Sequence, residues 1–178
     1  MFLPIYQPKA WQRGVQKLAA LRFFSTILSH TLHRIDPIVL DITDGKYTAT
    51  SWMTGLPVVW LTAKGAHTGQ IRTIPLVGIP QIERIVLIAT KFGSKRNPAW
   101  YYNLKANPIA SIRSDGTQIQ CRATELAGME YEQAWQAAIR MYPGYANYAS
   151  RAGDRNIPIL ALTPCSLETG SISLERIS

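Results

Sequence analysis

Three short segments of the chain combine residue types that could bind an anionic ligand. The first comprises residues 64–72, with the sequence KGAHTGQIR. Its two glycines, Gly65 and Gly69, allow close backbone approach or a positive φ angle, and cationic side chains flank them. A tight turn with exposed N–H groups and a nearby arginine could cradle a phosphate. A plain β-hairpin with solvated charges also fits, and the spacing alone slightly favours the hairpin.

The second segment, residues 90–103, has the sequence TKFGSKRNPAWYYN and follows an apolar run. It passes through a basic loop into a predicted helix, and the free N–H groups at a helix N-terminus bind anions. Asn97 suits the N-cap position, and Pro98 suits the first helical position. Trp100 could line a flat ring system or pack in the core, and the pattern favours neither role.

The third segment, residues 141–148, carries three tyrosines at spacings of three, in the sequence MYPGYANY. On a helix, Tyr142, Tyr145 and Tyr148 would lie roughly on one face. Their apolar rings could wall a pocket while their hydroxyls donate hydrogen bonds. An amphipathic face packed on the rest of the fold explains the same spacing at least as well.

No common catalytic or nucleotide-binding motif accompanies these segments. The chain lacks G-x-S-x-G, H-E-x-x-H, P-loop and G-x-G-x-x-G patterns. His30 and His33 have no nearby cysteine or third ligand, so we predict no metal site. Glu130 and Glu132 are two apart on a predicted helix and do not share a face. The chain is therefore either a binding module or an enzyme whose cofactor carries the difficult step.

The elements that must position these segments follow from hydrophobic periodicity. Apolar residues recur at spacings of three and four over residues 9–32, which predicts an amphipathic helix. Many short β-prone runs and few helices indicate an α+β fold, and a small barrel with helices packed on its outside is the natural closed form. We predict strands at residues 39–42, 47–51, 58–62, 71–79, 84–90, 109–113, 118–126 and 157–162, and further helices at 99–106 and 129–141.

Positive charge is concentrated in the middle of the chain. The 178 residues carry a net charge of +8, and residues 64–113 hold eight basic residues against one acidic residue, Glu83. A field concentrated in this way attracts an anionic partner. Nucleic acid, anionic lipid and a phosphorylated cofactor all qualify, and charge does not separate them.

The sequence also bears on location. No stretch approaches the roughly 18 apolar residues of a membrane span, and the first residues lack the order of a signal peptide. The two cysteines lie far apart, which fits a reducing setting. We therefore predict a cytoplasmic protein. The helix at 9–32 could contact a membrane surface through its apolar face, although packing against the barrel is the more ordinary role.

Three ordered runs resemble the deazaflavin-dependent nitroreductase family, also called F420H2-dependent quinone reductases. The runs are LTAKGAHTGQIRTIPLVGIP, IVLIATKFGSKRNPAWYYNLKANP and MYPGYANYASRAGDRNIPILALTP. They extend in order from about residue 61 to residue 164, over half of the chain. Three separated motifs in the right order are much more specific than any one of them.

The resemblance implies an α+β fold: a split β-barrel like that of FMN-binding proteins, preceded by an N-terminal helix. We divide the chain into an N-terminal helical extension at 1–36 and a barrel domain at 37–178. The implied activity is hydride transfer from reduced coenzyme F420 to a small organic acceptor such as a quinone, nitro compound or enone. The alternatives are an FMN-binding split-barrel oxidoreductase and a non-catalytic flavin- or deazaflavin-binding protein. Either a monomer or a homodimer is compatible with the resemblance.

Nucleic-acid binding is disfavoured, because the basic residues coincide with the family's cofactor motifs.

The resemblance assigns candidate catalytic roles to Tyr142, Tyr145, Tyr148 and Thr90. It assigns cofactor binding to Lys64, Gly65, His67, Thr68, Gly69, Arg72, Pro75, Thr90, Lys91, Phe92, Gly93, Lys95 and Trp100.

Three positions depart from the family pattern. His67 stands where lysine is usual, which weakens the positive charge at neutral pH. Phe92 stands where many members have glycine, which predicts a narrower pocket. Pro75-Leu76 is followed by Val77-Gly78 rather than by an aromatic residue, which could open the pocket or change the preferred substrate.

Overall fold

Six strands form one barrel in the part of the chain that the structure describes. The computed structural model describes residue 12 and residues 55–114 and 116–165. The strands are β1 (Val58–Lys64), β2 (Ile71–Gln81), β3 (Arg84–Ile88), β4 (Ile109–Ser114), β5 (Thr117–Glu125) and β6 (Ile159–Pro164). The other elements are the 3-10 turn η1 (Lys91–Gly93) and the helices α4 (Ala99–Ala106), α5 (Gly128–Met141) and α6 (Gly144–Ala152).

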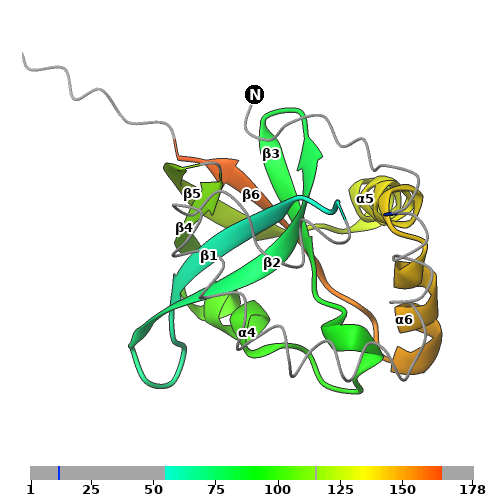
Figure 1. The fold of residues 1–178 in the computed structure, drawn as a ribbon. Coiled ribbons are helices and arrows are strands. Elements are labelled where there is room, and N and C mark those ends of the chain that lie inside the picture. The colour runs from blue at the N-terminus through cyan, green and yellow to red at the C-terminus, as the bar shows by residue number, and fades with distance from the viewer. Residues whose placement is uncertain (1–11, 13–54, 115, 166–178) are drawn as a thin grey trace, which may run out of the picture.

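The strands pair antiparallel and close in the order β1-β2-β3-β6-β5-β4 (Figure 1). Strand β1 completes the ring, because Leu61 lies opposite Ile74 on β2 and opposite Ile112 on β4. The predicted α+β barrel with outer helices is thereby confirmed. The strand and helix boundaries predicted within the described residues agree with the structure to within a few positions.

Two hydrophobic clusters share the strand β3. Its side chains alternate: Ile85 and Leu87 join the cluster that also contains Leu61. Val86 and Ile88 pack instead with residues of α5 and α6. Because both faces of this strand are buried, its sequence RIVLI shows no polar alternation.

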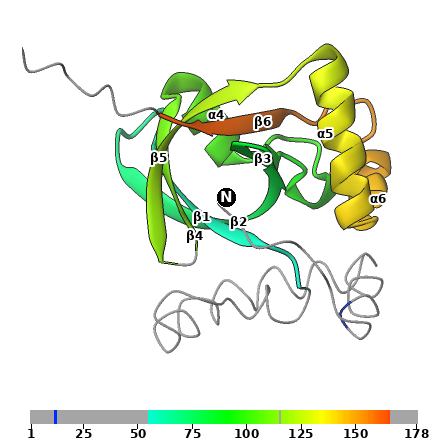
Figure 2. The same ribbon diagram turned by 90° about the horizontal axis from the view of Figure 1, so that it is seen from above.

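The helices cover different parts of the barrel. Helices α5 and α6 lie side by side against the outside of the barrel, next to β3 and β6 (Figure 2). Helix α4 lies at one end of the barrel and contributes Trp100 and Leu104 to the first cluster (Figure 1). Apart from residue 12, the predicted helix at 9–32 lies outside the described residues. The predicted strands at 39–42 and 47–51 and the predicted domain boundary at residue 36 also lie outside them.

Replacing Leu87 with alanine should lower the free energy of unfolding by about 2–5 kcal/mol, because a fully buried leucine leaves a cavity. Urea denaturation measures the loss. The control is Ile82→Ala at a side chain that is 92% exposed, where we expect a change within about 0.5 kcal/mol. Equal effects of the two substitutions would contradict the assignment of Leu87 to the core.

Candidate functional site

Residues 65–70 form the turn that joins β1 to β2, which we call the glycine turn. The Gly65 N–H donates to the Gln70 carbonyl oxygen at 2.8 Å, and the Gly69 N–H donates to the Gly65 carbonyl oxygen at 3.0 Å. Gly69 has a φ angle of +67°, and a Cβ atom on Gly65 would lie 2.8 Å from the Thr68 hydroxyl oxygen. Both glycines therefore build a tight turn, and the side chains of Lys64, His67, Thr68 and Arg72 are exposed around it.

Helix α4 supports this turn from one side. The Ala66 N–H donates to the Asn103 side-chain oxygen at 3.0 Å, and the Asn107 amide nitrogen donates to the Lys64 carbonyl oxygen at 3.4 Å. The Asn103 contact ties the first predicted segment to the second. Asn103 and Asn107 received no role from the sequence, because their partners lie 37 and 43 residues away in the chain.

The loop after β3 contains a run of left-handed residues. Lys91, Phe92 and Gly93 have φ angles of 46°, 57° and 81°, and the preceding Thr90 has a right-handed conformation. A right-handed residue followed by a left-handed one orients successive N–H groups towards one side, an arrangement that binds anions. Among the described residues, the N–H groups of Lys91 and Phe92 have no acceptor.

Arg155 forms hydrogen bonds with several residues of this loop. Its guanidinium donates to the carbonyl oxygens of Ser94 at 2.8 Å, Ala89 at 3.1 Å and Thr90 at 2.8 Å. It also donates to the Asn97 side-chain oxygen. No local pattern marks Arg155, because these partners lie 58 to 66 residues earlier in the chain. Burial lowers the pKa of the guanidinium, which nevertheless stays protonated at neutral pH.

The three tyrosines form a buried cluster where α5 meets α6. Each is at most 6% exposed, and their ring centroids are 5.6 to 6.1 Å apart. The Tyr142 and Tyr148 hydroxyls share a hydrogen bond of 3.4 Å. Burial raises the pKa of all three phenols, so each carries its proton at neutral pH.

The tyrosine cluster contacts the loop after β3. The Phe92 ring packs edge-on against the Tyr148 ring with a centroid distance of 5.9 Å, and it is 52% exposed. A Cβ atom on Gly93 would lie 2.8 Å from the Tyr148 carbonyl oxygen. Gly93 therefore permits the loop to lie directly on α6, and Phe92 borders the cluster on the loop side.

The remaining predicted residues lie in different environments. Thr90 is buried, while Lys91 and Lys95 are exposed on the loop. Pro75 lies on β2 opposite Trp60 and is half-buried. Trp100 is 7% exposed within the barrel cluster, so core packing accounts for its position. A role for Trp100 in cofactor binding stays a prediction.

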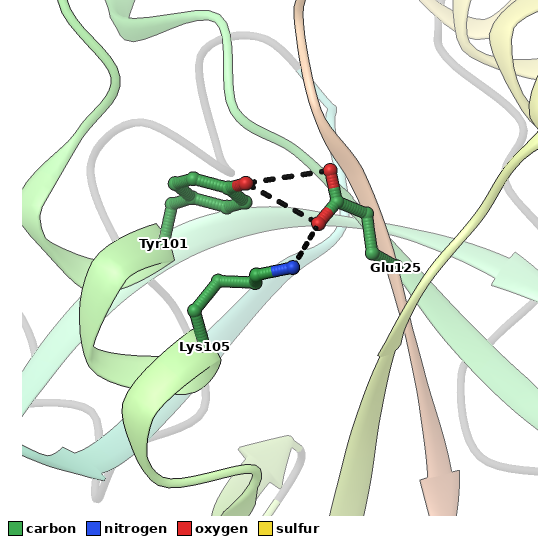
Figure 3. Close-up of polar contacts among 3 residues, drawn as sticks. All are labelled: Tyr101, Lys105 and Glu125. Carbon is green, nitrogen blue, oxygen red and sulfur yellow. Dashed lines mark hydrogen bonds and ion pairs between the residues drawn. The ribbon is translucent and has the colours of Figure 1, made fainter.

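Several positive side chains around the glycine turn and the loop after β3 have no negatively charged partner among the described residues. Within residues 55–114 and 116–165, ion pairs join Arg84 to Glu130 and Lys105 to Glu125. Figure 3 shows that Glu125 also accepts from the Tyr101 hydroxyl, which fastens α4 to β5. In the same ranges Lys64, Lys91, Lys95 and Arg96 have no carboxylate partner. This set of donors fits a ligand that carries phosphate and carboxylate groups.

Within the part of the chain that the structure describes, no three His, Cys, Asp or Glu side chains gather as metal ligands. His30 and His33 lie outside that part. None of the described helices is long and apolar enough to cross a membrane.

Known proteins match most of the described region. The family model for F420H(2)-dependent quinone reductase matches residues 32–164. An F420H(2)-dependent quinone reductase of Mycobacterium tuberculosis is 33% identical over 110 residues, covering 60% of this chain and 73% of that protein. A putative F420H(2)-dependent quinone reductase of the same organism is 26% identical over 109 residues, covering 61% of this chain and 91% of that protein.

Two solved structures are also similar. One is an F420-H2 dependent reductase, FDR-A, with 36% identity and a TM-score of 0.56, covering 60% of this chain and 93% of that chain. The other is described as a domain-swapped dimer, with 36% identity and a TM-score of 0.56, covering 60% of this chain and 79% of that chain.

The buried phenols predict a loss of stability in alkali. The ordinary tyrosine pKa is 10.0, and burial raises it in the folded state. Above pH 10.0 the unfolded chain releases these protons while the folded chain retains them. The free energy of unfolding should then fall by up to about 1.4 kcal/mol per pH unit for each phenol. Urea denaturation between about pH 8 and pH 11 measures this slope.

The Tyr142→Phe variant isolates the contribution of one phenol. It removes one retained proton and should lose stability less steeply above pH 10.0 than the parent protein does. Identical slopes for the two proteins would argue against burial of the Tyr142 hydroxyl.

Proposed function

Because the chain belongs to the F420H(2)-dependent quinone reductase family, we propose that it uses reduced coenzyme F420 to reduce a small organic acceptor. One observation carries the proposal: the glycine turn and the loop after β3 present cationic side chains that no described carboxylate neutralises. The similarity to F420H(2)-dependent quinone reductases favours a quinone as the acceptor. Nitro compounds and enones are further acceptors to assay.

The anionic tail of the cofactor is proposed to bind at the turn and the loop. Lys64 and Arg72 flank the glycine turn, and Lys91 and Lys95 lie on the loop. Arg72 already donates to the Gln70 side-chain oxygen at 3.3 Å, which directs its guanidinium along the turn. Exposed cations of this kind attract phosphate and carboxylate groups.

When bound, reduced coenzyme F420 supplies a hydride for a two-electron reduction. The chain's own residues would orient the acceptor and stabilise the negative charge that it gains. Tyr145 and Tyr148 suit that role as hydrogen-bond donors, because their raised pKa values keep the phenols protonated. The buried Thr90 hydroxyl is a further candidate donor at the start of the loop. Phe92 would set the width of the pocket beside Tyr148.

Assembly and location remain part of the proposal. The similar structure described as a domain-swapped dimer supports a homodimer over a monomer, and light scattering decides between them. Peripheral membrane contact would involve the predicted helix at 9–32, of which the structure describes only residue 12. The cytoplasmic location stays a prediction.

Purified protein should bind oxidised coenzyme F420 with a dissociation constant in the micromolar range or below, and FMN more weakly. A fluorescence titration with each compound measures both dissociation constants.

Lys64→Ala and Arg72→Ala should each weaken F420 binding by about tenfold, because a charge-assisted contact is lost. Arg122→Ala removes the same charge from an exposed position on β5 and should have little effect. A preference for FMN would instead favour the FMN-binding alternative.

Tyrosine substitutions test the proposed catalytic role. Tyr145→Phe and Tyr148→Phe should each lower kcat by about 10- to 100-fold if the phenols donate to the reacting acceptor. Steady-state kinetics with a quinone acceptor measures the loss. The control is Tyr131→Phe on α5, whose hydroxyl donates to the Ile157 carbonyl oxygen. Unchanged turnover in the single and double variants of Tyr145 and Tyr148 would refute this role.

A further inference from the structure

Arg155 lies between α6 and β6 and directs its guanidinium entirely towards the loop after β3. We propose that Arg155 is a positioning residue that holds residues 89–97 in the conformation that receives the anionic tail of the cofactor. This inference rests on the proposed function for the identity of the ligand. The hold on the loop itself is observed without any ligand, and it can be tested in that state.

The direction of the carbonyl groups supports the inference. Arg155 binds the carbonyl oxygens of Thr90 and Ser94, each at 2.8 Å. In a trans peptide the carbonyl and the following N–H point in opposite directions, and the described chain contains no cis peptide. The N–H groups of Lys91 and Lys95 must therefore point away from Arg155. Neither N–H has an acceptor among the described residues.

Two peptide units are thus oriented alike by one guanidinium. Their negative ends face Arg155, and their positive ends face away from it, at residues whose exposed side chains are also cationic. Main-chain N–H groups fixed in this way bind phosphate or carboxylate groups without having to reorganise. The proposed ligand class is accordingly a phosphate or carboxylate group of the cofactor tail.

The loop needs such a hold because its backbone is strained. Lys91 and Phe92 have φ angles of 46° and 57°, a left-handed region that residues with a Cβ atom rarely adopt. Strained residues persist only where surrounding contacts over-determine their conformation. Here the contacts are the four hydrogen bonds from Arg155 and the close approach of Gly93 to α6.

The positive charge of Arg155 also favours binding of an anion at the loop. Its hydrogen-bond partners among the described residues are three carbonyl oxygens and one amide oxygen, all of them neutral. No ion pair joins it to a described carboxylate. No described carboxylate therefore neutralises the charge of Arg155. This charge adds to the positive potential that attracts an anion to the loop.

The test compares Arg155→Lys with a matched arginine. Lysine keeps the positive charge but lacks the planar fork that binds several oxygens at once. The matched control is Arg84→Lys, because Arg84 donates to the side chains of Gln81 and Glu130 beside the turn between β2 and β3. Asn97→Ala removes a single partner of Arg155 and provides a milder variant that should fold if Arg155→Lys does not.

Hydrogen exchange is measured first, in cofactor-free protein. Amides of residues 89–97 should exchange at least about tenfold faster in Arg155→Lys, with the amides of β1 unchanged. Titration with coenzyme F420 should then show a dissociation constant raised by about tenfold, and the KM for cofactor should rise more than kcat falls. Arg84→Lys should alter neither the exchange of the loop nor the affinity. Asn97→Ala should shift both quantities in the same direction by smaller factors.

Each outcome decides a separate claim. Loop exchange and affinity close to those of the parent protein, in folded Arg155→Lys or in Asn97→Ala, would overturn the proposal. Faster loop exchange with unchanged affinity would reduce Arg155 to a structural role and would also overturn it. Failure of the parent protein to bind coenzyme F420 would refute the proposed function, while exchange in the cofactor-free protein would still show whether Arg155 holds the loop.

Discussion

The antiparallel pairing of β3 with β6 is the constraint on which the arrangement of the site depends. Ile88 at the end of β3 lies opposite Ile159 at the start of β6, and the Ala89 N–H donates to the Pro158 carbonyl oxygen at 2.9 Å. The loop that leaves β3 therefore starts beside the segment that enters β6. This register brings Arg155 to residues 89–97, and it leaves α6 beside the loop.

The same two strands join the two hydrophobic clusters of the protein. Leu160 and Leu162 of β6 belong to the barrel cluster, whereas Ile159 and Ala161 pack with α5 and α6. The tyrosine cluster thus packs on the outside of the barrel against β3 and β6. The loop after β3 begins beside the same two strands. Helix α4 joins the arrangement through Asn103, which binds the glycine turn. A small number of tertiary contacts therefore connects three segments that are far apart in sequence.

Much of the fold could be predicted from the sequence, because alternation and turn residues are local signals. Periodicity located each described strand to within a few residues, and three ordered motifs indicated the family to which the chain belongs. The roles of Arg155 and Asn103 could not be predicted, since each depends on partners distant in the chain. The φ angles of Lys91 and Phe92 were equally inaccessible, because neither residue type favours a left-handed conformation. The catalytic and cofactor-binding assignments stay predictions.

Closure of the barrel has a consequence for self-association. Each of the six described strands has a partner on both sides, since β1 pairs with β4 to complete the ring. Sheets commonly extend from one molecule to another by adding a strand at an open edge, and the described strands offer no such edge. Two copies that associate through the described strands would therefore meet through side-chain surfaces or by exchanging a whole segment of chain. Exchange of that kind leaves the pairing within each barrel intact, so a dimer could form without sacrificing the strand register that positions the loop.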